Sequence, residues 1–214
     1  MNKIIENFLD IHKKEYSIER LDTETAFEHF TNKCIVNKYS NERFDPSDIM
    51  TDPGEKGLDG VAICVNGRVI TSNDELESIL GEAKSLDVRF VFIQTKTSEH
   101  FDGDEIGTFI YGVKAFFAPE ALRPQTNEKM DNLISLKDEI YRHSIDMTNA
   151  PVLDLYYVCC GKWVEGNGLM SRVNLIFSHL LIRKILVRSF LPLRLGKNYY
   201  YLQRTQKESQ QIFH

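Results

Sequence analysis

The sequence has only four cysteines, and none of them has the spacing of a zinc ligand. Cys34, Cys64, Cys159 and Cys160 include no Cys-x-x-Cys pair and no Cys/His pair at zinc spacing, so a structural zinc site is not expected. Cys159 and Cys160 are adjacent in an apolar run, where neighbouring side chains of a strand point to opposite faces. We therefore expect reduced, partly buried thiols that pack and do not carry redox chemistry.

Targeting and membrane-spanning segments are also missing. The first seven residues place charges inside a short apolar run and offer no small-residue cleavage site, so they predict a helix and not a signal peptide. A later apolar stretch, residues 174–195, is interrupted by Arg183, Lys184 and Arg188, which argues against a membrane span. We expect a cytoplasmic protein with no membrane span, and a homo-oligomer is left open.

Positive charge is scarce over most of the chain. Residues 171–214 hold eight Lys/Arg and one acidic residue, so the first 170 residues hold 18 basic and 30 acidic ones, a net charge of −12. Affinity for phosphate backbones comes largely from Lys and Arg that displace counterions. The acidic body is the main argument against a nucleic-acid-binding function.

A chain of 214 residues, 42% of them apolar, is long enough to bury a substantial core in one domain. Hydrophobic periodicity, capping signals and the Asn66-Gly67 turn predict the elements in order. We expect helices at residues 2–16 and 23–38, a hairpin at 60–71, a short helix from about 72 to 80, a strand at 87–97, helices at 103–117 and 128–145, and a strand after Pro151. Residues 39–58 are polar and rich in turn residues.

This order predicts an α/β fold, with a mixed sheet flanked by helices. The long helical crossover between the last two strands implies that they are parallel. We assign residues 1–170 to this domain and treat residues 171–214 as a basic, apolar tail. The tail is interpreted as a packed helix with solvated cations, as a basic amphipathic surface helix, or as a truncated, non-native continuation that makes few contacts with the body.

The polar residues most indicative of chemistry lie at the ends of two predicted strands. Phe90, Phe92, Gln94 and Lys96 share one face, because strand side chains alternate with period two, and Asp59 opens the hairpin. A carboxylate, an amide oxygen and an ammonium at neighbouring strand ends form a workable metal and water site for cleaving a phosphodiester. The simpler interpretation is a turn aspartate beside the exposed end of a strand.

These residues also carry a resemblance to a known family. Asp59 followed by Gln94-x-Lys96 resembles the PD-(D/E)xK nuclease superfamily, in the QxK variant of Mrr-like restriction endonucleases. The wider sequence is similar to the N-terminal domain of AIPR proteins, which are implicated in abortive phage infection, from about residue 1 to about 165. The matching segments are Phe-Glu-His-Phe (27–30), Glu-Arg-Phe (42–44), Gly-Leu-Asp-Gly-Val-Ala (57–62), Phe-Ile-Gln-Thr-Lys-Thr-Ser (92–98) and Gly-Val-Lys-Ala-Phe-Phe (112–117).

The resemblance implies a restriction-endonuclease-like αβββαβ core and a site for Mg²⁺ or Mn²⁺. Asp59 would be the principal metal ligand, Gln94 would supply its amide oxygen, and the carbonyl of Thr95 would lie beside it. Lys96 would orient or deprotonate the attacking water, and Glu28 is a weaker candidate for an additional carboxylate ligand. A Gln in place of an acid removes one negative charge, so metal binding should be weaker than in an all-carboxylate site.

The sequence thus predicts a metal-dependent nuclease domain of an abortive-infection phage defence protein, which hydrolyses phosphodiester bonds in nucleic acid, with DNA favoured. The alternative is a non-catalytic protein, either a truncated relic or an interaction module that keeps the nuclease fold. The acidic body and the change of composition after residue 170 favour the alternative. The presence of Asp59, Gln94 and Lys96 together favours the enzyme.

Overall fold

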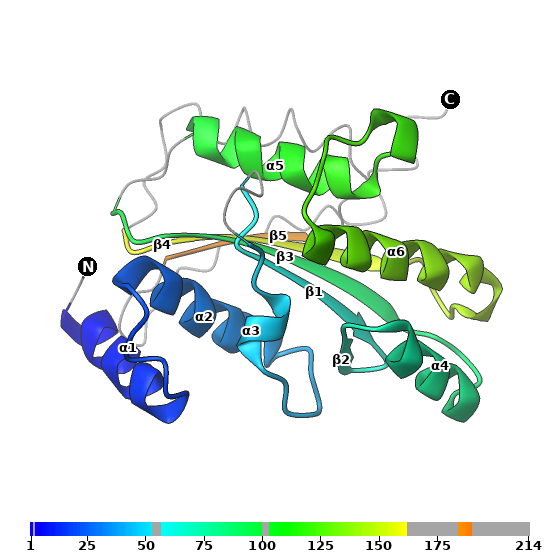
Figure 1. Ribbon diagram of the computed structural model, residues 1–214, viewed down its shortest axis with the longest axis horizontal. Helices are drawn as coiled ribbons and strands as arrows, with labels where there is room; N and C mark the ends of the chain where they lie inside the picture. The colour runs from blue at the N-terminus through cyan, green and yellow to red at the C-terminus, as the bar shows by residue number, and fades with distance from the viewer. Residues whose placement is uncertain (2, 53–56, 100–102, 162–183, 190–214) are drawn as a thin grey trace.

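A mixed sheet with helices on both faces forms the body of the protein (Figure 1). The computed structural model describes residues 1, 3–52, 57–99, 103–161 and 184–189. The helices are α1 (Lys3–Glu15), α2 (Thr23–Val36), α3 (Pro46–Ile49), α4 (Asn73–Glu82), α5 (Gly103–Phe117) and α6 (Glu128–Arg142), with 3-10 turns η1 (Glu120–Leu122) and η2 (Ser144–Asp146). The strands are β1 (Gly60–Val65), β2 (Arg68–Ile70), β3 (Val88–Lys96), β4 (Val152–Cys159) and β5 (Lys184–Ser189).

Local signals in the sequence set several element ends. The side chain of Asp22 caps α2 by accepting from the backbone nitrogen of Thr25 at 2.9 Å. Ser72 and Glu75 form the predicted capping box at the start of α4. Asn66 and Gly67 have φ of 51° and 77°, which a two-residue hairpin turn between β1 and β2 requires.

The strands are ordered β2-β1-β3-β4-β5 across the sheet. β1 pairs antiparallel with β2 and β3, whereas β3 and β4 are parallel, as the long helical crossover predicts. The α/β class and the mixed sheet flanked by helices are therefore confirmed. The order α2, β1, β2, β3, α5, β4 contains the expected αβββαβ arrangement, with α4 and α6 added to it.

Each face of the sheet has its own apolar core. Phe90 and Phe92 of β3 pack with residues of α5 and α6 on one face, where Figure 1 shows both helices above the strands. Val91 and Ile93, which alternate with them, pack with α1 and α2 on the other face. The apolar residues of β3 end at Ile93 and are followed by the polar residues Gln94, Thr95 and Lys96.

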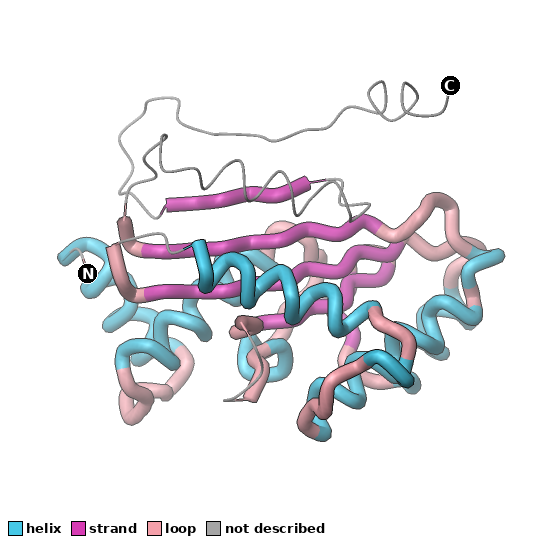
Figure 2. Tube along the Cα trace, turned by 90° about the horizontal axis from the view of Figure 1, so that it is seen from above, coloured by secondary structure: helices cyan, strands magenta, loops and turns pink. Residues whose placement is uncertain are grey.

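The C-terminal part of the chain contributes a strand and not the expected helix. Residues 184–189 form β5, which lies beside β4 at one edge of the sheet (Figure 2). The two strands are parallel, with Asp154 opposite Lys184 and Cys159 opposite Ser189. A helix through 174–195 and a tail without contacts are therefore wrong for these six residues, because all six pair with β4 along the backbone. The rest of the tail lies outside the described residues.

The remaining sequence-level expectations concern thiols and membranes. The four cysteines are free, and burial raises the pKa of the Cys159 thiol to about 11 and that of Cys64 to about 12, so both stay protonated at neutral pH. This agrees with a packing role. No helix within the described ranges has the length and apolarity that crossing a membrane requires.

Candidate active site

A short loop with two glycines delivers Asp59 to the start of β1. Gly57 has a φ of 69°, and a Cβ there would lie 2.7 Å from the backbone nitrogen of Phe109 in α5. A Cβ at Gly60 would lie 2.4 Å from Oδ1 of Asn32 in α2. Both positions need glycine because the loop passes closely between helices on opposite faces of the sheet.

Hydrogen bonds hold this loop in place. The backbone nitrogen of Asp59 donates to the carbonyl of Ile93 at 2.9 Å, which extends the pairing of β1 with β3 by one residue. The side-chain amide of Asn32 donates to the carbonyl of Asp59 at 3.2 Å, and the hydroxyl of Thr51 donates to the carbonyl of Leu58. The Asp59 side chain therefore projects from a backbone that is fixed on two sides.

The Asp59 carboxylate meets the end of β3. Its Oδ2 accepts three hydrogen bonds, from Gln94 Nε2 at 2.9 Å, from the backbone nitrogen of Thr95 at 2.6 Å and from the Thr95 hydroxyl at 2.9 Å. The structure thus brings together Asp59, Gln94 and Thr95 from adjacent strands. The donor role of Thr95 through its N–H and hydroxyl was not predicted from the sequence.

Gln94 is buried, with 4% of its surface exposed, so it is not the exposed end of a strand. Its amide nitrogen faces Asp59, and its Oε1 is buried without a hydrogen-bond partner among the described residues. Leaving a buried amide oxygen unpaired costs about 1–3 kcal/mol. A bound cation or water would satisfy this oxygen.

Lys96 lies beside this group and is held by two residues that sequence reasoning missed. Its Nζ forms an ion pair with Glu105 Oε1 in the first turn of α5, at 3.2 Å. The hydroxyl of Tyr157 in β4 donates to Glu105 Oε2 at 2.8 Å. An acidic first turn in the helix after β3, and a tyrosine in the largely apolar strand β4, were the signals available for finding them.

Burial and nearby negative charges raise the pKa of two carboxyls here. Burial raises the pKa of Asp59, while the hydrogen bonds from Thr95 and the charge of Lys96 oppose the shift. Burial, and next the charge of Asp59, raise the pKa of Glu28 in α2 to about 7. Because the charges of Asp59 and Lys96 act on its pKa, Glu28 is electrostatically coupled to the site from the helical layer of α2.

Two side-chain oxygens at the site are of the hard kind that a divalent cation such as Mg²⁺ prefers. Oδ1 of Asp59 makes no hydrogen bond within the described part of the chain, and Gln94 Oε1 is unpaired. Among the described residues, no group of three or more His, Cys, Asp or Glu side chains could hold a metal ion. Mg²⁺ commonly keeps several waters and takes only one or two carboxylates, so two protein oxygens are compatible with such a site.

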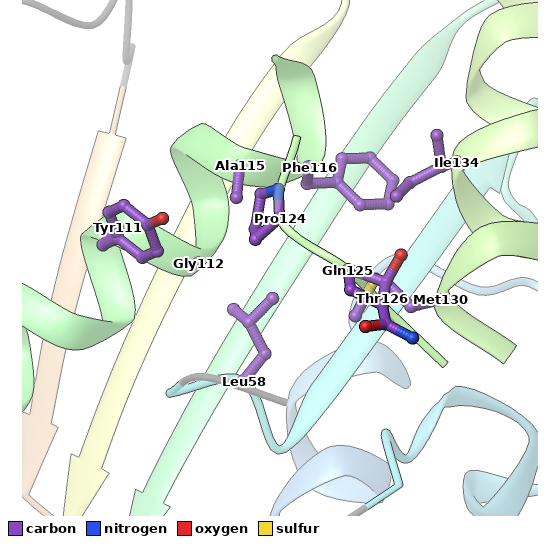
Figure 3. A pocket seen from close by; sticks show the side chains of 10 residues that line it. All are labelled: Leu58, Tyr111, Gly112, Ala115, Phe116, Pro124, Gln125, Thr126, Met130 and Ile134. Carbon is purple, nitrogen blue, oxygen red and sulfur yellow. The ribbon is translucent and has the colours of Figure 1, made fainter. Parts of the chain in front are cut away.

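A small apolar pocket lies elsewhere on the α5 face (Figure 3). Its volume is about 60 Å³, and it is lined by Leu58, Tyr111, Gly112, Ala115, Phe116, Pro124, Gln125, Thr126, Met130 and Ile134. Leu58 connects it to the loop that carries Asp59, but none of Glu28, Asp59, Gln94 and Lys96 lines it. The pocket is therefore separate from the candidate active site.

Comparisons with models of protein families, with curated proteins and with solved structures found no match. The class of protein is accordingly defined by the fold and by the site alone. The fold is a mixed α/β sheet flanked by helices. The site joins a carboxylate, an amide and an ammonium where β1 begins and β3 ends.

Proposed function

We propose that this protein is a divalent-metal-dependent nuclease that hydrolyses phosphodiester bonds through Asp59, Gln94 and Lys96, with DNA as the favoured substrate. The contact between Asp59 and Gln94 is the observation that carries the proposal, because it joins two candidate ligands that are 35 residues apart in the sequence. The resemblance to AIPR proteins is the reason for placing the activity in cytoplasmic defence against phage. A homo-oligomer is compatible with this function.

The proposed ligands are all oxygens. Asp59 would bind the ion through Oδ1, and Gln94 through Oε1 after its side-chain amide rotates to face the ion. The carbonyl of Thr95 and the carboxylate of Glu28 would be further ligands. A bound Mg²⁺ or Mn²⁺ supplies Lewis-acid polarisation of a phosphoryl oxygen and lowers the pKa of a bound water. Asp59 and Gln94 would orient the ion, and Lys96 would orient or deprotonate the water beside the phosphate.

One observation favours the non-catalytic alternative. The polar groups satisfy each other without an ion, because Gln94 points its amide nitrogen at Asp59 and Lys96 is paired with Glu105. A relic or an interaction module that keeps the nuclease fold would show such a closed network. The unpaired Gln94 Oε1 is the feature that this alternative leaves unexplained.

A cleavage assay with matched variants distinguishes the two functions. The substrates are plasmid, linear double-stranded and single-stranded DNA and RNA, each with Mg²⁺, with Mn²⁺ and with a chelator. We expect Lys96→Ala to lower turnover by roughly a hundredfold or more with the fold intact, because Lys96 acts on the water or on developing charge. Asp59→Ala should abolish cleavage together with metal binding.

Lys114→Ala, an exposed lysine on α5, is the control for general loss of positive charge. It should leave cleavage unchanged at constant salt. A Lys96→Ala variant as active as the parent on every substrate would exclude the proposed mechanism.

A further inference from the structure

Glu105 occupies a fixed position relative to the sheet. It lies in the first turn of α5, where the partial positive charge of the helix N-terminus favours a carboxylate. Its Oε2 accepts from the hydroxyl of Tyr157, and Tyr157 is only 2% exposed and belongs to the core beneath α5. Because a buried tyrosine side chain anchors one carboxylate oxygen, the other oxygen is held in place as well.

The second oxygen faces Lys96. Glu105 Oε1 lies 3.2 Å from Lys96 Nζ, and the two side chains are 40% and 34% exposed. Ion pairs with this much exposure contribute little to stability, typically 0–1 kcal/mol. The pair is anchored by a buried tyrosine, and positioning of Lys96 therefore explains it better than stabilisation does.

The sheet register supports the same arrangement. Gln94 of β3 is paired with Tyr157 of β4, so the amide that contacts Asp59 and the hydroxyl that anchors Glu105 lie on neighbouring strands at the same level. Lys96 follows Gln94 by two residues, on the same face of β3. A lysine side chain with many rotamers is thus restrained at the end of the sheet where Asp59 lies.

From this geometry we propose that Glu105, anchored by Tyr157, is a positioning residue that fixes Lys96 as an ion-paired ammonium aimed at the Asp59 site. The inference rests on the proposed function. An ammonium has three donors and no lone pair, so Lys96 can keep one N–H on Glu105 and direct the others at a water or a phosphate oxygen. In this position it orients the water or the phosphate and stabilises developing charge.

Three variants test the proposal through steady-state kinetics. Glu105→Gln keeps the shape but removes the charge, and we expect kcat to fall about tenfold with KM within about twofold, since misplacing a reacting group by about 1 Å costs up to a hundredfold. Tyr157→Phe keeps the ring in the core and should lower kcat in the same direction but less. Glu105→Asp keeps the charge and should retain more activity than Glu105→Gln.

The double variant Glu105→Gln/Tyr157→Phe should be no slower than Glu105→Gln alone, because both changes release the same lysine. Glu77→Gln, an exposed glutamate of α4, is the matched control and should behave as the parent. Equal or higher kcat in Glu105→Gln would overturn the proposal and make Glu105 neutral or inhibitory. Additive losses in the double variant would overturn it as well.

A spectroscopic signature separates failure of this inference from failure of the proposed function. Nitrogen-resolved NMR of lysine side chains should show a Lys96 ammonium signal in the parent, identified by its absence in Lys96→Ala. The signal should broaden or shift in Glu105→Gln and in Tyr157→Phe. If the parent cleaves nothing, the nuclease proposal fails while this spectrum still tests the ion pair. A Lys96 signal unchanged in Glu105→Gln would refute the positioning role.

Discussion

At the scale of single residues, the asymmetry of Asp59 defines the site. One carboxylate oxygen takes three hydrogen bonds from Gln94 and Thr95, and the other takes none within the described residues. The bonded oxygen fixes the orientation of the carboxylate, and the free oxygen remains available as a ligand. A carboxylate that served only to close the turn would not need to be built this way.

A second residue-level feature is the buried histidine pair between α1 and α2. His12 Nε2 and His29 Nδ1 are 2.7 Å apart, and Asp45 lies 3.8 Å from the other nitrogen of His29. Burial, and next the charges of His29 and Lys33, lower the pKa of His12 to about 4. His29 is therefore buried in the layer formed by α1 and α2 and pairs with His12 there.

The histidine pair predicts loss of stability in acid. A folded-state pKa of about 4 for His12, below the usual 6.5, means that the unfolded chain binds the proton more tightly. The contribution of neutral His12 to the free energy of unfolding is complete above pH 6.5. It is lost as the pH falls from 6.5 to about 4, by up to about 3 kcal/mol. Urea unfolding of the parent and of His12→Phe at pH 7.0 and 4.5 measures it.

We expect a smaller fall in stability between these two pH values for His12→Phe, although that variant is less stable at pH 7.0. His143→Gln, a half-exposed histidine after α6, should lose as much stability as the parent. An equal fall in His12→Phe and in the parent would mean that other groups cause the acid sensitivity.

At the scale of elements, the loop before β1 connects the fold to the site. Gly57 approaches the backbone of α5, and Gly60 approaches Asn32 of α2. Asp59 lies between them, so the distance between the two helical layers determines where its carboxylate points. Changes in this loop should therefore affect stability and ligand geometry together.

Gly57→Ala tests this dependence. The new Cβ would lie 2.7 Å from a backbone atom of α5 that cannot rotate away, and φ is positive. We expect a loss of about 2 kcal/mol or more and weaker metal binding, measured by thermal melts and by Mn²⁺ titration.

Gly107→Ala, in α5 itself, is the matched control. A Cβ at Gly107 would meet nothing within 4 Å, so this change should leave the site intact and stabilise the helix by up to about 1 kcal/mol. A Gly57→Ala variant with the melting temperature and metal affinity of the parent would show that the loop is not constrained as described.

Elements with local signals could be predicted from the sequence, and elements fixed by distant partners could not. The caps at Asp22 and Ser72 and the Asn66-Gly67 turn act within four residues, so pattern alone located α2, α4 and the hairpin. Helix α3 was missed because four residues give no periodicity.

The candidate site shows the same division. Alternation along β3 predicted which of its residues share a face, and the resemblance linked Asp59 to them. The contact between Glu105 and Tyr157 joins residues that are 52 apart in the sequence and depends on where α5 packs. The orientation of the Gln94 amide depends on Asp59, 35 residues away. No local pattern encodes either feature. The strand at residues 184–189 was missed because its apolar, basic composition also suits a helix.

At the scale of the whole molecule, the C-terminal residues supply both positive charge and a strand at the edge of the sheet. The first 170 residues are acidic, with a net charge of −12, and residues 171–214 carry +7. β5 joins part of this basic segment to β4. Part of the positive charge that the first 170 residues lack is therefore attached to the same sheet as the candidate site.

Removing residues 171–214 should destabilise the protein. β4 is buried along most of its length, and without β5 its outer edge would have unpaired backbone groups. We expect the melting temperature to fall by about 10 °C, since each kcal/mol is worth about 2–4 °C at this size.

A chain ending at residue 190 keeps β5 and lacks only the residues after it. Comparing it with the chain ending at residue 170 shows how much of the lost stability comes from the residues between 171 and 190, which include β5. If the chain ending at residue 170 melts within about 2 °C of the parent, β5 is dispensable. The prediction of a non-native continuation would then regain support.

The central claim is that Asp59 and Gln94 form a divalent-cation site, and Mn²⁺ titration followed by electron paramagnetic resonance tests it most directly. We predict one Mn²⁺ bound per chain, lost in Asp59→Ala, weakened roughly tenfold in Gln94→Ala and retained in Lys96→Ala. Absence of Mn²⁺ binding by the parent, or binding unchanged in Asp59→Ala, would contradict the account.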